Sequence, residues 1–219
     1  MKKSLISLLF VAITLAGCSA DEQPPAREAT TPVPVVNAAA PAVAWVEVTT
    51  TAGTFVLELD GRAAPLTVTH FLKNVDSGFY TGLIFHRVIP GFMIQGGGYT
   101  EDLVLRESNE TVPNESGNGL ANLRSTIAMA RTGDPHSANT QFYINVVNNI
   151  PEDTTTASLD PIKHTSNGRW GYTVFGRVTE GMDVIDLIAQ YETEPNGPGG
   201  APLPIIPVVI ESMKRISRD

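Results

Sequence analysis

An arginine and a glutamine interrupt an apolar stretch of the chain, and their chemistry needs an explanation. The stretch is FHRVIPGFMIQGGGYT, residues 85–100, in which Arg87 and Gln95 stand among residues that otherwise predict buried strand. A guanidinium keeps its charge and presents a rigid set of donors. Together with the surrounding aromatic, amide and thioether side chains, these residues suit a reaction that needs neither a nucleophile nor a proton relay.

The usual catalytic constellations are poorly represented elsewhere. The chain has one cysteine, and its four histidines lack the paired spacing of metal ligands, so we expect no metal and no cofactor. One of the four, His70, falls inside a predicted helix, where we expect a structural or surface role. GGGYT, residues 96–100, lacks the strand–turn–helix context of a dinucleotide loop, and no Gly-x-Ser-x-Gly elbow occurs.

The N-terminus has the form of an export signal. Residues 1–17, MKKSLISLLFVAITLAG, place two lysines before an apolar core of about a dozen residues, which is too short for a permanent membrane span. The next residue completes LAGC, which resembles the lipobox of bacterial lipoproteins, so we expect a lipid anchor on Cys18. An ordinary cleaved signal is the alternative. The resemblance also implies sorting by the following residue, Ser19, which favours the outer membrane, with the domain facing the periplasm.

Residues 18–44 predict a tether. They contain five prolines with much alanine and threonine, and they show neither helical nor strand periodicity. Loss of Lys2 and Lys3 with the signal leaves 13 basic against 23 acidic residues, so the net charge changes from −8 to −10. An acidic chain without a basic cluster is a poor candidate for binding nucleic acid.

The remaining residues, 45–219, predict one mostly β domain. Two helices, over residues 64–80 and 180–191, are inserted singly among six to eight strands: WVEVTT, TFVLEL, LIFHRVI, FMIQGG, STIAMA, QFYINVV, YTVFGRV and PVVIESMKRI. This order does not give the regular alternation of a parallel sheet. It favours an antiparallel barrel or sandwich capped by two helices, in which closure would remove exposed edges.

Four ordered segments resemble the cyclophilin family of peptidyl-prolyl cis-trans isomerases. They are FHRVIPGFMIQGGGYT, NGLANLRSTIAMARTGD, TQFYINV and GYTVFGRVTEGMDVID, and the second is particularly similar to bacterial periplasmic cyclophilins. The resemblance extends over residues 45–216. It implies an eight-stranded antiparallel closed β-barrel with a helix capping each end, and an enzyme that isomerises the bond before proline.

The resemblance also assigns candidate site residues. Arg87 matches the catalytic arginine of the family, and Gln95 matches a glutamine that contacts the substrate backbone. The positions that form the slot for the proline ring are matched by Phe92, Met93, Tyr143 and Leu159. Two further groove positions that bind the peptide backbone are matched by Ala130 and Gln141.

Several groove positions depart from common family patterns. Tyr143 stands where many members have phenylalanine, so its hydroxyl needs a partner or water. Tyr172 replaces a histidine of eukaryotic members, and Arg131 replaces an asparagine; we expect both to line the substrate groove. The pocket tryptophan of some members falls near Ser158, which implies weak cyclosporin binding.

Three functions are compatible with these features. The first is an active, monomeric, lipid-anchored isomerase whose partners are proline-containing peptides and unfolded exported proteins. The second is a prolyl-peptide-binding module or holdase with little turnover. The third is a β-barrel lipoprotein that carries a small apolar ligand, which a deep closed cavity would support and a packed interior with an external groove would exclude.

Overall fold

A computed structural model describes residues 40–106, 108, 110–150, 158–161 and 169–218. The predicted signal, the predicted lipidation site Cys18 and most of the predicted tether lie outside these residues. Within the described part of the chain, no helix is long and apolar enough to cross a membrane.

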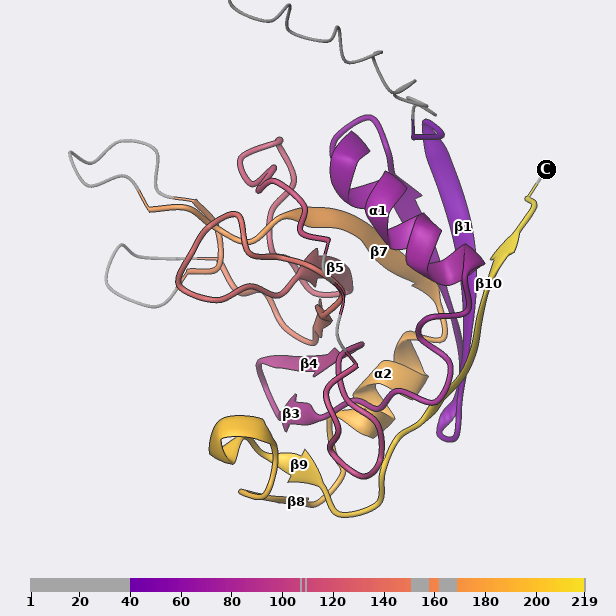
Figure 1. Cartoon of the computed structure of the whole chain (residues 1–219), viewed down its shortest axis with the longest axis vertical. Helices are drawn as coiled ribbons and strands as arrows, with labels where there is room; N and C mark the ends of the chain where they lie inside the picture. The colour runs from indigo at the N-terminus through magenta and orange to yellow at the C-terminus, as the bar shows by residue number, and fades with distance from the viewer. Residues whose placement is uncertain (1–39, 107, 109, 151–157, 162–168, 219) are drawn as a thin grey trace, which may run out of the picture. The chain divides into compact units, whose positions relative to one another are not determined.

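Two long strands form the first hairpin of the fold. β1 (Val43–Thr50) pairs antiparallel with β2 (Gly53–Asp60), and β10 (Ile210–Ile216) pairs with the other edge of β1 (Figure 1). Val46 and Val48 are fully buried, as expected for alternating positions that face a core. The first strand starts two residues before the expected Trp45, because Ala44 is already buried and paired with Leu59.

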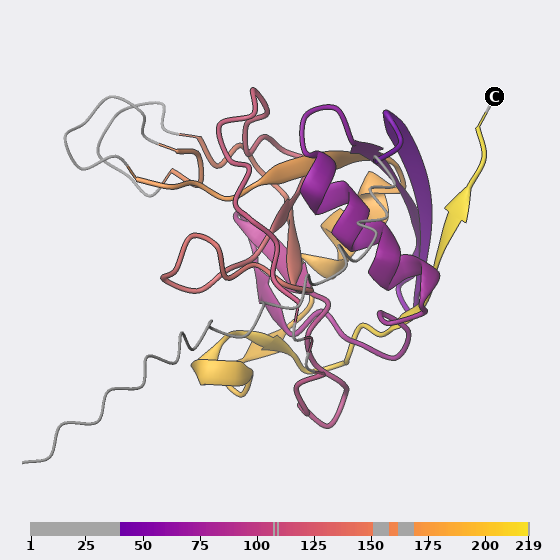
Figure 2. The ribbon, with the colours of Figure 1, turned by 45° about the horizontal axis from the view of Figure 1, so that its top comes forward.

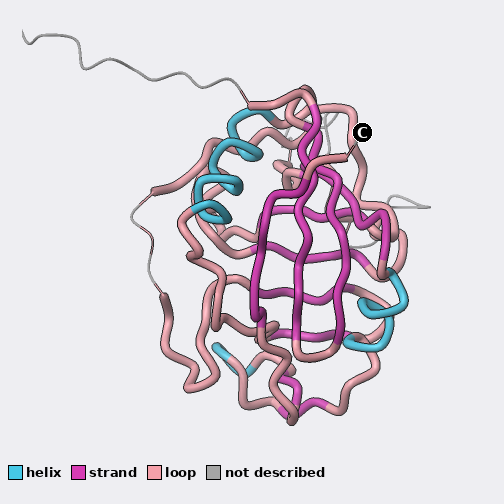
Figure 3. The backbone as a smooth tube through the Cα atoms, turned by 90° about the vertical axis from the view of Figure 1, so that its right-hand side faces the viewer, coloured by secondary structure: helices cyan, strands magenta, loops and turns pink. Residues whose placement is uncertain are grey.

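The eight main strands form one antiparallel sheet. The remaining strands are β3 (Arg87–Ile89), β4 (Met93–Gly96), β5 (Thr126–Met129), β6 (Phe142–Asn145) and β7 (Val174–Glu180). The spatial order is β10-β1-β2-β7-β5-β6-β4-β3, and every neighbouring pair is antiparallel. The prediction of a mostly β, antiparallel fold with two helices is confirmed, and Figure 3 shows the strands with one helix to each side.

The prediction of a closed barrel was wrong. The sheet is an open half-barrel, because its end strands β3 and β10 do not pair with each other as strands. The segments that precede these strands are joined by an isolated bridge between Ile84 and Val209 and by backbone hydrogen bonds on either side of it, from Phe85 to Val208 at 3.0 Å and from Ile210 to Leu83 at 2.8 Å. β3 has three residues, and the backbone N–H of Val88 at its centre donates to the carbonyl of Pro202 rather than to β10, so no ladder between β3 and β10 forms.

A small hairpin that the sequence did not predict lies beside β3. It consists of β8 (Thr193–Glu194) and β9 (Leu203–Pro204), joined through the 3-10 turn η1 (Pro198–Gly200). The backbone N–H of Val88 in β3 donates to the carbonyl of Pro202 at 2.9 Å. The loop therefore covers one side of the strand that carries Arg87.

Both predicted helices are present. α1 (Pro65–Asp76) begins with proline in its first turn, buries Val68 and Phe71, and ends before Gly78, whose φ of 71° suits glycine. α2 (Met182–Ile188) is shorter and buries Ile185 and Ile188. Figure 2 shows α1 crossing in front of the curled sheet.

Side chains fill the interior of the curled sheet. Phe71 of α1 lies 5.1–5.8 Å, between ring centroids, from Tyr80, Phe142 and Phe175, and all four rings are buried. Tilted and edge-on contacts of this kind add to the burial of large apolar surfaces. A packed aromatic interior argues against a carrier of small apolar ligands.

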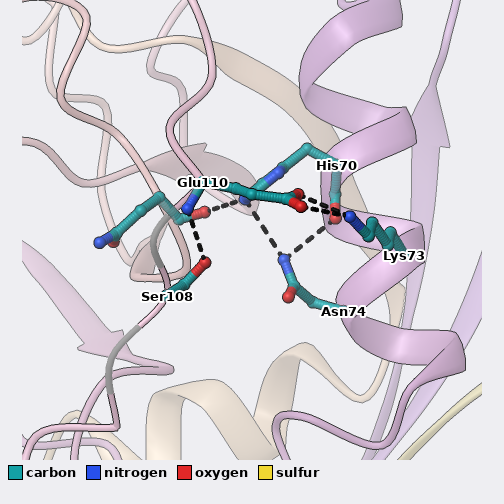
Figure 4. Close-up of polar contacts among 6 residues, drawn as sticks. His70, Lys73, Asn74, Ser108 and Glu110 are labelled. Carbon is teal, nitrogen blue, oxygen red and sulfur yellow. Dashed lines mark hydrogen bonds and ion pairs between the residues drawn. The ribbon is translucent and has the colours of Figure 1, made fainter. Parts of the chain in front are cut away.

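Polar contacts fasten the long loop after β4 to α1 (Figure 4). Lys73 forms an exposed ion pair with Glu110 at 2.5 Å, and Asn74 Nδ2 contacts His70 Nε2 at 3.3 Å. His70 Nε2 also contacts the carbonyl oxygen of Asn139 at 2.5 Å. His70 is buried within this cluster, so its role is structural, as expected from its place in a helix.

Candidate active site

Strand register brings the predicted catalytic pair together. Arg87 of β3 is directly opposite Gln95 of β4, and Gln95 is opposite Tyr143 of β6. Directly paired residues project from the same face of a sheet. Arg87 Nη1 donates to Gln95 Oε1 at 3.2 Å, and Gln95 Nε2 donates to Gln141 Oε1 at 2.9 Å. The result is one row of three hydrogen-bonded polar side chains.

A groove of about 250 Å³ opens beside this row. The predicted site residues that line it are Arg87, Phe92, Met93, Gln95, Ala130, Arg131, Tyr143, Leu159 and Tyr172. Gln141 lines an adjoining hollow of about 490 Å³, which shares Arg87 and Gln95 with the groove. All predicted site residues other than Cys18, which lies outside the described part, are therefore gathered in one place.

The apolar wall of the groove comes from separate segments. Met93 and Tyr143 are buried, and Phe92, Leu159 and Tyr172 pack against them. Asn149 holds two of these segments, because its Nδ2 donates to the carbonyl of Phe92 at 2.9 Å and its carbonyl accepts from the N–H of Leu159 at 3.1 Å. The wall is thus fixed by backbone contacts that local sequence patterns do not reveal.

Comparison with known proteins identifies the family of this groove. Residues 45–215 match the family described as cyclophilin type peptidyl-prolyl cis-trans isomerase. This chain is a cyclophilin. The family assignment that the sequence motifs predicted is confirmed.

Bacterial relatives are similar over most or all of the cyclophilin chain. A peptidyl-prolyl cis-trans isomerase of Streptomyces antibioticus is 52% identical over 169 residues, which cover 77% of this chain and 96% of that protein. Peptidyl-prolyl cis-trans isomerase A of Dickeya dadantii is 43% identical over 218 residues, with 100% of both chains covered.

A solved structure shows the same fold. A Cryptosporidium parvum cyclophilin, crystallised in the presence of the dipeptide Ala-Pro, matches with a TM-score of 0.59 and covers 80% of this chain and 99% of that one. At 22% sequence identity, the likeness concerns the fold alone.

The tyrosine that departs from the usual cyclophilin phenylalanine has a partner for its hydroxyl. Tyr143 Oη donates to Asn122 Oδ1 at 2.7 Å, and the backbone N–H and Nδ2 of Asn122 donate to Asp160 Oδ1 at 2.9 and 2.8 Å. Burial, above all, raises the pKa of Tyr143; Tyr172 and Asp160 act in the same direction and Arg131 opposes them. The phenol therefore stays protonated and donates.

Arg131, the second departure, is held rigidly at the groove. Its three nitrogens each donate to a backbone carbonyl, and its guanidinium carbon lies 4.6 Å from the centre of the Tyr172 ring. Ser158, near which the pocket tryptophan of some family members was aligned, is 4% exposed and is not among the residues that line the groove. Trp170 lies nearby in sequence, is 46% exposed and packs edge-on against His136.

Sequence reasoning missed two residues that shape this site. Asn122 lies in a loop with no periodic pattern, so only the fold brings it to Tyr143. His86 lines the adjoining hollow, lies edge-on to Tyr99, and has no partner for Nδ1 among the described residues. Burial is the main cause that lowers the pKa of His86 to about 4, so its imidazole is neutral. The only sequence feature that could have pointed to His86 as a site residue is its position directly before Arg87.

The described residues contain no group of three or more histidine, cysteine, aspartate or glutamate side chains that could hold a metal ion. The site is built from two arginines, two glutamines, and aromatic and aliphatic side chains.

Proposed function

We propose that this cyclophilin accelerates the cis–trans isomerisation of X–Pro bonds by stabilising the twisted amide. Amide resonance sets a barrier of about 18–20 kcal/mol, and the uncatalysed change takes tens to hundreds of seconds. In the twisted state the prolyl nitrogen becomes pyramidal and regains its lone pair. A fixed donor directed at that nitrogen therefore binds the transition state more tightly than the ground state.

The observation that carries this proposal is the state of Arg87. Its guanidinium lines the groove, its hydrogen bond to Gln95 leaves further N–H groups available, and among the described residues no carboxylate forms an ion pair with it. Gln95 is itself held by Gln141, so the donor is oriented before substrate binds. A reduction of the barrier by roughly 7 kcal/mol would correspond to about five orders of magnitude in rate.

The apolar wall is proposed to hold the proline ring. Phe92, Met93 and Leu159 form an apolar surface in the same groove as Arg87. A proline ring that packs against this surface would place its nitrogen near the guanidinium. Binding of this kind contributes orientation, while the arginine contributes the charge that distinguishes the transition state.

The test is isomerisation of an Ala-Pro peptide by residues 40–219, comparing the natural sequence with Arg87→Ala. We expect rapid turnover that falls at least about 100-fold in the variant, with an unchanged circular dichroism spectrum. Peptide binding without turnover by the natural sequence would contradict the proposal and support a prolyl-binding module or holdase instead.

We further propose that a lipid on Cys18 anchors the protein to the outer membrane, where it acts as a monomer on exported proteins in the periplasm. The export signal, LAGC and Ser19 support this location. Growth with labelled palmitate should label the natural chain, and Cys18→Ala should lose the label and leave the outer membrane fraction. An unlabelled natural chain would contradict the anchor.

A further inference from the structure

The groove carries positive charge in an acidic protein. The chain has a formal net charge of −8, yet the residues that line the groove and the adjoining hollow include two arginines, Arg87 and Arg131, and no carboxylate. The ion pairs formed elsewhere by the described residues include neither arginine. The proposed mechanism uses one of these charges and leaves the other without an assignment.

The Arg131 side chain is fixed without being neutralised. Nη1 donates to the carbonyl of Thr132 at 2.8 Å, Nη2 to that of Trp170 at 2.8 Å, and Nε to that of Gly171 at 3.2 Å. A guanidinium has five N–H donors, so these contacts leave two of them for another acceptor. Carbonyl oxygens carry no formal charge. The positive charge therefore remains, in one orientation, at the wall of the groove.

The acidic side chains near Arg131 in space or sequence are engaged with other groups. Asp160 Oδ1 accepts two hydrogen bonds from Asn122, at 2.9 and 2.8 Å. Asp134 Oδ1, in the loop that follows Arg131, accepts from the backbone N–H of His136 at 2.8 Å. Among the described residues, no carboxylate forms an ion pair with Arg131, so its charge is open to a carboxylate of a bound peptide.

We infer that Arg131 is a specificity-determining residue that selects peptides with aspartate or glutamate next to the proline. The inference rests on the proposed function, because it concerns the substrate of the same groove. A substrate carboxylate would accept from the uncommitted N–H groups of Arg131 while the proline ring lies against the apolar wall. The planar fork of arginine matches a carboxylate, and its fixed position reduces the loss of side-chain freedom on binding.

The expected preference is modest, because Arg131 is only half-buried. Ion pairs at such positions change equilibria by roughly two- to five-fold, and added salt screens them. The test compares kcat/KM of the mature chain for peptide pairs that differ as glutamate against glutamine, placed directly before or directly after proline. We expect a glutamate-to-glutamine ratio of about 2 to 5 at low salt for one of these placements, falling toward 1 in about 0.5 M sodium chloride.

Variants identify the residue responsible. Arg131→Gln should bring the ratio close to 1, and Arg131→Glu should make lysine preferred over glutamine at the same place. Arg215→Gln, on β10, removes the same charge away from the groove and should keep the ratio of the natural chain. Arg131→Lys should retain part of the preference, because it keeps the charge but loses the fork.

Two results would overturn the inference. One is a ratio near 1 at low salt for both placements in the natural chain. The other is a ratio that Arg131→Gln leaves unchanged. If that variant does not fold, the salt dependence of the natural chain decides the question. A failure of the proposed function differs from both, because neutral peptides would then show no turnover either.

Discussion

The two halves of the sheet treat their arginines differently. In the half with long strands, β1, β2, β7 and β10, arginines lie against carboxylates: Arg177 with Glu58, Arg215 with Asp76 and Arg218 with Glu180, at 2.6–3.3 Å. In the half with strands of three or four residues, β3 to β6, Arg87 is held by an amide. An amide orients a guanidinium without cancelling its charge, so the short-strand half keeps a cation for substrate.

Strand length and site location are connected. β3, β4 and β6 have only three or four residues each, so their side chains lie close to the loops. Together with the loop residues Leu159 and Tyr172, they line one groove. The long-strand half has longer ladders, with register shifts only at Thr49/Thr50 and Val56/Leu57, and β1 buries alternate side chains against the core. The long strands there stabilise the fold, and the short strands on the other side leave room for loops that line a ligand site.

The largest effect is expected when arginine is replaced by lysine in the short-strand half, and the same replacement in the long-strand half is its control. Arg87→Lys removes the fork that Gln95 orients, and we expect kcat/KM for an Ala-Pro peptide to fall about 100-fold or more. Arg177→Lys, in the paired half, should change it less than about twofold, because exposed ion pairs contribute little. Equal losses in the two variants would remove the functional distinction between the halves.

The second prediction concerns stability: the free energy of unfolding should fall at acid pH because of the buried His86 beside the groove. The pKa of His86 is lowered to about 4, so the unfolded chain binds a proton at higher pH than the folded chain. This contribution to the free energy of unfolding is complete above about pH 6.5. It is lost as the pH falls from about 6.5 to about 4, by up to about 3 kcal/mol.

Urea unfolding at pH 7, 5.5 and 4.5 measures this loss. His86→Gln should flatten the pH dependence over that interval, because the variant has no imidazole to protonate there. The matched control is His136→Gln, which changes an exposed histidine and should keep the slope of the natural chain. An unchanged slope in His86→Gln would show that other groups carry the acid sensitivity.

The sequence predicted what depends on local periodicity and on motifs. Both helices and the antiparallel strands were predictable, because burial repeats along each element. The groove positions were predictable only from the resemblance of the motifs around Arg87 and Gln95 to the cyclophilin family. The open edge between β3 and β10 was not predictable, because it depends on the β8–β9 hairpin, whose Pro202 accepts the hydrogen bond of Val88 in β3. The contact of Tyr143 with Asn122 was equally hidden, because it joins a strand to a loop 21 residues earlier.

The smallest effect tests whether a carboxylate next to α1 stabilises the fold through its hydrogen bonds to backbone N–H groups or through its charge alone. Glu115, from the long loop, accepts hydrogen bonds from the N–H groups of Leu66 and Thr67 at the start of α1, at 3.1 and 2.8 Å. It thus serves as a cap that the helix lacks at Ala64. Glu115→Ala should lower the free energy of unfolding by about 1–2 kcal/mol, because two N-terminal donors lose their acceptor.

The matched control is Glu110→Ala, in the same loop. Glu110 also contacts α1, but through an exposed ion pair with Lys73, so its loss should lower the free energy of unfolding clearly less than the loss of Glu115 does. Both free energies come from urea unfolding at pH 7. Similar losses would mean that charge near α1, rather than the capping hydrogen bonds, fastens this loop. A larger loss in Glu115→Ala would show that a carboxylate stabilises the scaffold when it satisfies backbone donors, which a surface ion pair does not do.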